Sequence, residues 1–118
     1  MAGRLPTPQE ARRLLSADAF DAAQFHAHAR GYLESGQPHQ ALAFLEKAPE
    51  PALLERLRDQ AVQEGDAFAL AWVERIGKAP VTREHWGRLA ENARARGKDA
   101  FAREAERRAG IRETTRSA

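Results

Sequence analysis

Residues 25–48 read Phe-His-Ala-His-Ala-Arg-Gly-Tyr-Leu-Glu-Ser-Gly-Gln-Pro-His-Gln-Ala-Leu-Ala-Phe-Leu-Glu-Lys-Ala, and this stretch decides the fold of the chain. Apolar residues recur three and four positions apart in two segments, and Gly36 and Pro38 separate the segments. The pattern predicts two amphipathic helices joined by a short turn. Because two short helices cannot bury their own apolar faces, similar pairs should stack against them.

Two looser copies of this pattern follow, at Leu54 to Gly77 and at Trp86 to Ala109. Proline-containing segments separate the copies, because a proline disfavours the helical conformation in the residue before it. We therefore expect an all-α protein, an α-solenoid of three antiparallel helical hairpins. The breaks inside the hairpins fall at Gly36, Gly65 and Gly97, and the repeats cover about residues 22–50, 51–80 and 82–110.

A short helix should precede the three hairpins. Thr7 supplies a hydroxyl cap, Pro8 suits the first helical position, and Glu10 is placed to reach back to the cap. This helix should end near Ala17, and further caps are expected at Asp18 or Asp21, Asp66, Thr82 and Asp99. We expect a flexible arm at residues 1–6, a single domain at 7–109 and a frayed tail at 111–118.

Composition narrows the class of protein. The chain has 118 residues, of which 42% are hydrophobic and 31% charged, a balance suited to one domain of helices with a wet face. Without cysteine it can form no disulfide and no Cys-ligated zinc site. Its uncharged runs are too short to span a bilayer, so we expect a cytoplasmic protein with no membrane partner.

The three pairs resemble the tetratricopeptide repeat (TPR) family in the spacing of their aromatic residues, small residues and turn glycines. The matching positions are Phe25, Ala29, Tyr32, Gly36, Ala41, Leu45 and Ala48 in the first copy, Leu54, Leu57 and Gly65 in the second, and Trp86, Leu89, Ala90, Gly97, Ala102 and Ala109 in the third. Four residues depart from the pattern: Arg58 and Leu70 replace small residues, and Glu74 and Glu106 replace aromatic ones.

The resemblance implies a function as a protein-protein interaction module, such as an adaptor, scaffold or chaperone. In this family the first helices of successive pairs line a concave groove that holds a peptide or helix of a partner. Carried over by spacing, the groove positions are His26, Arg30, Leu33, Glu55, Asp59, Val62, Gly87, Glu91 and Arg94. The alternative reading of each is a solvated helix face. No Lys/Asn set matches the positions that clamp a partner's C-terminal carboxylate in some members. Small three-repeat members also include bacterial secretion chaperones, an analogy of fold alone.

Metal binding and catalysis are not expected. His26 and His28 are two positions apart on a helix, so their side chains point roughly 200° apart and cannot share an ion. Ser16, Ser35 and Ser117 lie in no nucleophile motif, and no glycine-rich phosphate loop follows a strand. We expect a protein that is not an enzyme and needs no cofactor.

Two further functions remain open from the sequence. Residues 83–118 contain ten Lys or Arg against six Asp or Glu, a net charge of +4 that could bind nucleic acid. Only Phe101 lies among these basic residues as a stacking aromatic, and the interleaved glutamates can pair with the arginines. Homo-oligomerisation is the other alternative, through an exposed part of the apolar segment 67–76. Trp72 and Trp86 are expected to pack in the core rather than bind a partner.

Overall fold

The computed structural model describes residues 5–16 and 21–110, and all regular structure in these ranges is α-helical, as predicted. The expectations for the first residues of the arm, for Asp18 and the end of the first helix near Ala17, and for the tail at 111–118 lie outside the described residues. The helices are α1 (Pro8–Ser16), α2 (Ala22–Glu34), α3 (Pro38–Lys47), α4 (Pro51–Glu64), α5 (Ala67–Ile76), α6 (Arg83–Ala95) and α7 (Asp99–Ala109).

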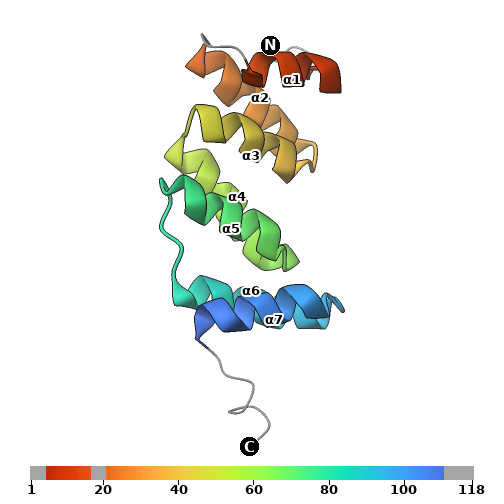
Figure 1. Ribbon diagram of the computed structural model, residues 1–118, viewed down its shortest axis with the longest axis vertical. Helices are drawn as coiled ribbons and strands as arrows, with labels where there is room; N and C mark the ends of the chain where they lie inside the picture. The colour runs from red at the N-terminus through yellow and green to blue at the C-terminus, as the bar shows by residue number, and fades with distance from the viewer. Residues whose placement is uncertain (1–4, 17–20, 111–118) are drawn as a thin grey trace, which may run out of the picture.

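Consecutive helices pack in three pairs, α2 with α3, α4 with α5 and α6 with α7. The first helices of the pairs also contact one another, α2 with α4 and α4 with α6, and so do the second helices, α3 with α5 and α5 with α7. In Figure 1 the pairs follow one another along the long axis, with α1 at one end against α3 and with α6 and α7 at the other. The first and second helices thus form two layers.

Local side chains start most helices where the sequence predicts. Glu10 N–H donates to the Thr7 hydroxyl over 3.2 Å, and Thr7 N–H donates to the Glu10 carboxylate over 2.9 Å. Asp21, Asp66 and Thr82 each accept a backbone N–H of the helix that follows. These side chains satisfy N–H groups that have no partner inside the first turn.

Glu50 sets the start of α4: it accepts the N–H of Ala52 over 2.9 Å, and Pro51 occupies the first helical position. One predicted helix cap is wrong by one residue. Asp99 was expected to cap the last helix, but its backbone is already helical and Lys98 takes the cap position without a side-chain cap bond. The carboxylate of Asp99 in the first turn still favours the helix dipole.

The predicted bends are confirmed at all three glycines. Gly36, Gly65 and Gly97 end the first helix of each pair with φ of +79°, +72° and +76°, a conformation that favours glycine. Gly65 is the closest-packed of the three, because a Cβ atom built on it would lie 2.7 Å from Cα of Ala93 in α6. The turn after α4 therefore touches the backbone of the next pair.

The core runs between the two layers. Phe25, Tyr32 and Phe44 form a ring cluster in the first pair, with ring centroids 5.0 and 5.8 Å from that of Phe44. Trp86 is 2% exposed, which confirms its predicted place in the core. Trp72 was expected there too but is only partly buried and packs against the edge of the core, because its ring lies on the side of α5 that no further helix covers completely. The apolar helix α5 is not buried on every side, because Phe68 is 56% exposed.

Candidate functional site

An open cleft of about 350 Å³ lies between α4 and α6, the first helices of the second and third pairs. Two of its residues, Asp59 and Val62, are among the predicted groove positions. The other four were missed, because the groove was carried over at fixed positions of each repeat and the cleft also takes the residues beside them. The lining is Asp59, Val62 and Gln63 from α4 and His85, Arg88 and Asn92 from α6.

A hydrogen bond across the cleft ties its two helices together. The Asn92 side-chain amide of α6 donates to the backbone carbonyl of Val62 in α4 over 2.7 Å. This carbonyl lies in the last turn of α4, where it also accepts the Gly65 N–H over 3.3 Å. A direct bond thus joins the first helices of two adjacent pairs, which form the walls of the cleft.

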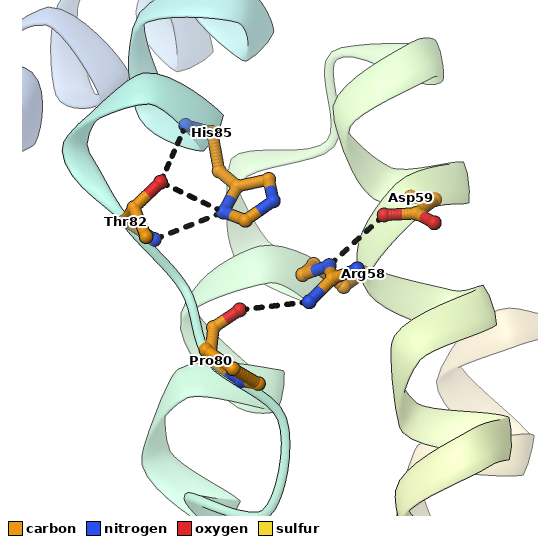
Figure 2. A network of polar contacts seen from close by, with 5 residues as sticks. All are labelled: Arg58, Asp59, Pro80, Thr82 and His85. Atoms are coloured by element: carbon orange, nitrogen blue, oxygen red, sulfur yellow. Dashed lines mark hydrogen bonds and ion pairs between the residues drawn. The ribbon is translucent and has the colours of Figure 1, made fainter.

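Arg58 fixes the connection that leads into α6. Arg58 lies on α4, and only 16% of its side chain is exposed. Its Nη1 donates to the carbonyl of Pro80 over 3.0 Å, and its Nε donates to the Asp59 carboxylate over 2.9 Å. Figure 2 shows this guanidinium between α4 and the segment that carries Thr82 and His85. Arg58 thus links Asp59, a lining residue of the cleft, to the segment that leads into α6.

His85 caps α6 and also lines the cleft. Thr82 N–H donates to His85 Nδ1 over 2.9 Å, and His85 N–H donates to the Thr82 hydroxyl over 3.3 Å (Figure 2). This is a capping box in which histidine replaces the usual glutamate or glutamine. Because Nδ1 accepts, the ring proton of the neutral form lies on Nε2, which is free to donate. The signal in the sequence is a threonine three positions before a polar side chain.

The surroundings of His85 disfavour its charged form. Burial lowers the pKa of His85 below the usual 6.5, and the neighbouring charge of Arg58 lowers the pKa further. Asp59 and Glu84 act in the opposite direction, and Arg88 adds a smaller lowering effect. Protonation at Nδ1 also removes the acceptor that Thr82 N–H needs. The folded state therefore favours neutral His85.

We expect the protein to become less stable as pH falls, because His85 then takes up a proton. Because the unfolded chain binds this proton more readily than the folded one, the contribution of His85 is present above its unfolded pKa of 6.5 and is lost as pH falls below it. His85→Gln keeps an acceptor for Thr82 N–H but does not titrate. Urea unfolding at pH of about 7 and about 5 should show a smaller loss in H85Q than in the wild type.

His85→Ala measures the contribution of the helix cap to stability separately from the effect of protonation. It removes the acceptor at every pH, so it should cost about 1 kcal/mol at neutral pH, a typical value for a helix cap. The remaining histidines, His26, His28 and His39, are the same in all three proteins and cancel in the comparison. Equal pH dependence of the wild type and H85Q would rule out His85 as the titrating group.

The predicted groove positions of α2 do not form one continuous surface with this cleft. His26 Nε2 donates to the carbonyl of Ala48 over 3.0 Å, Arg30 is exposed and Leu33 is buried. The N-terminal segment covers part of α2, because a Cβ atom on Gly31 would lie 2.8 Å from the Leu5 side chain. The open cleft therefore starts at α4.

The remaining groove positions belong to α4 and α6. Glu55 and Glu91 are exposed on these helices, and Gly87 is half-buried. Arg94 lies in a different environment, since it donates from Nε and Nη2 to the carboxylate of Glu106 in α7 over 2.9–3.1 Å. The side chain of Arg94 thus joins the two helices of the last pair.

The described residues meet the requirements of neither a metal site nor a membrane-spanning helix. In residues 5–16 and 21–110 no three His, Cys, Asp or Glu side chains gather closely enough to hold a metal ion. Within the same ranges no helix has both the length and the apolar character needed to cross a membrane. Two further clefts, of about 320 and 330 Å³, flank α1 and include residues of α1 and α2.

Compared with family models, with curated proteins and with solved structures, the chain matches none.

Proposed function

We propose that this protein is a non-catalytic protein-protein interaction module of the TPR-like type, an adaptor, scaffold or chaperone. The cleft between α4 and α6 would hold a peptide or helix of the partner. The observation that carries the proposal is the cleft itself, an open concave surface lined by first helices of adjacent pairs. Ligand sites favour such concave surfaces where a few polar groups converge.

The contacts between helices support a TPR-like arrangement of the three pairs. Each first helix packs on the next first helix, and each second helix packs on the next second helix, as the stacking of repeated hairpins requires. The turn glycines are only 29 and 32 residues apart, short of the 34 residues typical of the family. We propose that the close contact of Gly65 with Ala93 accommodates the shorter repeats.

The cleft offers groups that suit a polypeptide. His85 Nε2–H and the exposed guanidinium of Arg88 can donate to backbone carbonyls, and the Asp59 carboxylate can accept backbone N–H groups. Val62 also lines the cleft, although only 6% of this residue is exposed. Donors and acceptors on opposite walls fit a peptide backbone, which carries both kinds of group in alternation.

The basic end of the chain supports nucleic-acid binding less well. Arg94 is paired with Glu106, and Arg107 and Arg108 both donate to Glu104. The hydrogen bond from Arg108 is the main reason that the pKa of Glu104 lies below its usual value. Arginines that are paired within the protein release fewer counterions on binding a phosphate backbone, so they contribute less to affinity.

Charge reversal in the cleft tests the proposal. Asp59→Lys and Arg88→Glu change exposed side chains on opposite walls and should weaken partner binding at least about tenfold. Because Asp59→Lys also removes the contact with Arg58, circular dichroism would check that both variants remain folded. The partner would first be captured from nuclease-treated extract of the source organism and identified by mass spectrometry. Its affinity would then be measured by calorimetry against each variant.

Matched variants outside the cleft provide the control. Glu34→Lys on α2 and Arg103→Glu on α7 change exposed residues by the same charges, and both should bind like the wild type. Equal loss in the cleft and control variants would contradict a role for the cleft. Binding of short RNA that weakens steeply between low and high salt would instead favour the nucleic-acid alternative.

A further inference from the structure

Three aromatic rings form a cluster on the surface of α3 and α5, which we call the aromatic patch: His39, Phe68 and Trp72. Phe68 is the exposed large hydrophobic side chain of the described residues. Its ring centroid lies 5.2 Å from that of His39 and 5.7 Å from that of Trp72, both in edge-on geometry. A single exposed apolar residue is ordinary, but an interlocked group of three rings at the surface is not.

Polar contacts hold the two rings of the patch that have polar atoms, Trp72 and His39. Trp72 Nε1 donates to the Glu46 carboxylate over 2.6 Å, and His39 Nε2 lies 3.0 Å from the Asp66 carboxylate. The Arg75 guanidinium lies over the Trp72 ring at 5.8 Å. The rings are therefore already ordered before any partner arrives. Binding to a pre-ordered surface loses less side-chain entropy, so such a patch suits an interface.

The patch is separate from the cleft between α4 and α6. Its rings come from the second helices of the first two pairs, whereas the cleft is lined by first helices. The two sites have no residue in common. The patch therefore needs an occupant of its own, and the inference below does not depend on the function proposed for the cleft.

The charges beside the patch decide which occupant fits. Glu46 and Asp66 would repel the phosphates of a nucleic acid, and Arg75 would repel a strongly basic partner. Arg75 and Glu46 approach each other at 3.5 Å, with 66% and 52% of their side chains exposed. Both charges are solvated enough to form new pairs at little cost. A surface that carries both signs around an apolar centre is complementary to itself.

We propose that the aromatic patch is the contact surface of a symmetric homodimer of this chain. A two-fold axis through the patch places Phe68 of each copy against the rings of the other. It also brings Arg75 of each copy to Glu46 of the other, so the charges match in both directions. The result is an apolar centre with a charged rim, the usual composition of a protein interface.

Replacement of the exposed ring by a charged side chain should weaken the dimer. Sedimentation velocity over a roughly hundredfold range of concentration should show wild-type protein passing from monomer to dimer. Phe68→Glu should weaken dimerisation at least about tenfold, as expected for an aromatic at the centre of an interface. Ala52→Glu adds the same charge at an exposed position in the first turn of α4 and should dimerise like the wild type.

A charge swap tests the geometry of the dimer. Arg75→Glu alone places acidic residues against each other across the axis, and Glu46→Arg alone places basic residues against each other. Each variant should therefore dimerise at least about tenfold less well. An equimolar mixture of the two variants should form mixed dimers, because the acidic residues at positions 46 and 75 of one variant then face the basic residues of the other, and both contacts across the axis are ion pairs. Circular dichroism would check that all variants remain folded. A wild type that stays monomeric, a dimer that survives F68E, or a mixture without recovery would each overturn the proposal.

Discussion

Gly65→Ala is expected to lower the free energy of unfolding by about 3 kcal/mol. Two costs add at this position. A side chain at φ of +72° is strained by roughly 1 kcal/mol. The new Cβ would also lie 2.7 Å from Cα and 2.8 Å from the backbone N of Ala93, and overpacking of this kind costs about 1–3 kcal/mol. These two atoms belong to the backbone of α6, which cannot move aside as the end of a flexible side chain could.

The other turn glycines separate the two costs. Gly36 and Gly97 have φ of +79° and +76°, but no atom lies within 4 Å of a Cβ built on either. Gly36→Ala and Gly97→Ala should therefore cost only about 1 kcal/mol each. Urea unfolding followed by circular dichroism measures all three variants. If G65A proved no less stable than the two controls, the tight contact between the α4 turn and α6 would be wrong.

Arg94→Leu is the second large expected effect, a loss of about 2 kcal/mol. The Glu106 side chain is 10% exposed, and the Arg94 guanidinium binds both of its oxygens. Removal of the arginine leaves a mostly buried carboxylate without this partner, which costs about 3–5 kcal/mol for a fully buried pair. Because 43% of the Arg94 side chain is exposed, solvent reduces the cost.

A double variant distinguishes loss of the pair from loss of packing. In Arg94→Leu/Glu106→Leu the mostly buried carboxylate is removed together with the guanidinium that binds it, so the double variant should be more stable than R94L alone. Arg88→Leu serves as control, because the Arg88–Glu84 pair is exposed on both sides and should change stability by less than about 0.5 kcal/mol. A double variant less stable than R94L would show that Glu106 stabilises the fold without Arg94, and would contradict loss of this partner as the cause of the R94L effect.

The two variants also bear on the cleft. Gly65 determines how closely α4 approaches α6, and Arg94 anchors α6 to α7 from the opposite side. The helix α6, which supplies three of the six lining residues, is thus held on both flanks. A partner that binds the cleft should stabilise the protein against urea in proportion to its concentration.

Most helix boundaries could be predicted from the sequence, because they depend on residues within one turn. The Thr7 and Glu10 pair, the Asp21 and Asp66 caps and the three turn glycines all act within a few positions of the helix end they define. Where a prediction failed, as at Asp99, the neighbouring Lys98 has a distant partner, the carbonyl of Glu64 at 2.9 Å. A contact between residues that are 34 positions apart leaves no pattern in the local sequence.

The periodic apolar residues similarly determined which faces are buried, since a helix with one apolar stripe must turn that stripe inward. Trp86, Phe25 and Leu45 lie in the core where the stripe places them. The exposure of Phe68 could not be predicted in this way. The segment 67–76 is apolar on most sides, and the number of neighbours it meets depends on how the pairs stack.

Only the tertiary structure decided the site. Asp59 and Val62 follow from repeat spacing, but His85, Arg88 and Asn92 join them because α6 packs against α4 at one particular offset. That offset depends on the Gly65–Ala93 approach and on the bond from Asn92 to Val62, which connect residues about 30 positions apart. Caps, turns and apolar stripes are local and can be read along the chain, whereas a cleft between two helices exists only once both are in place.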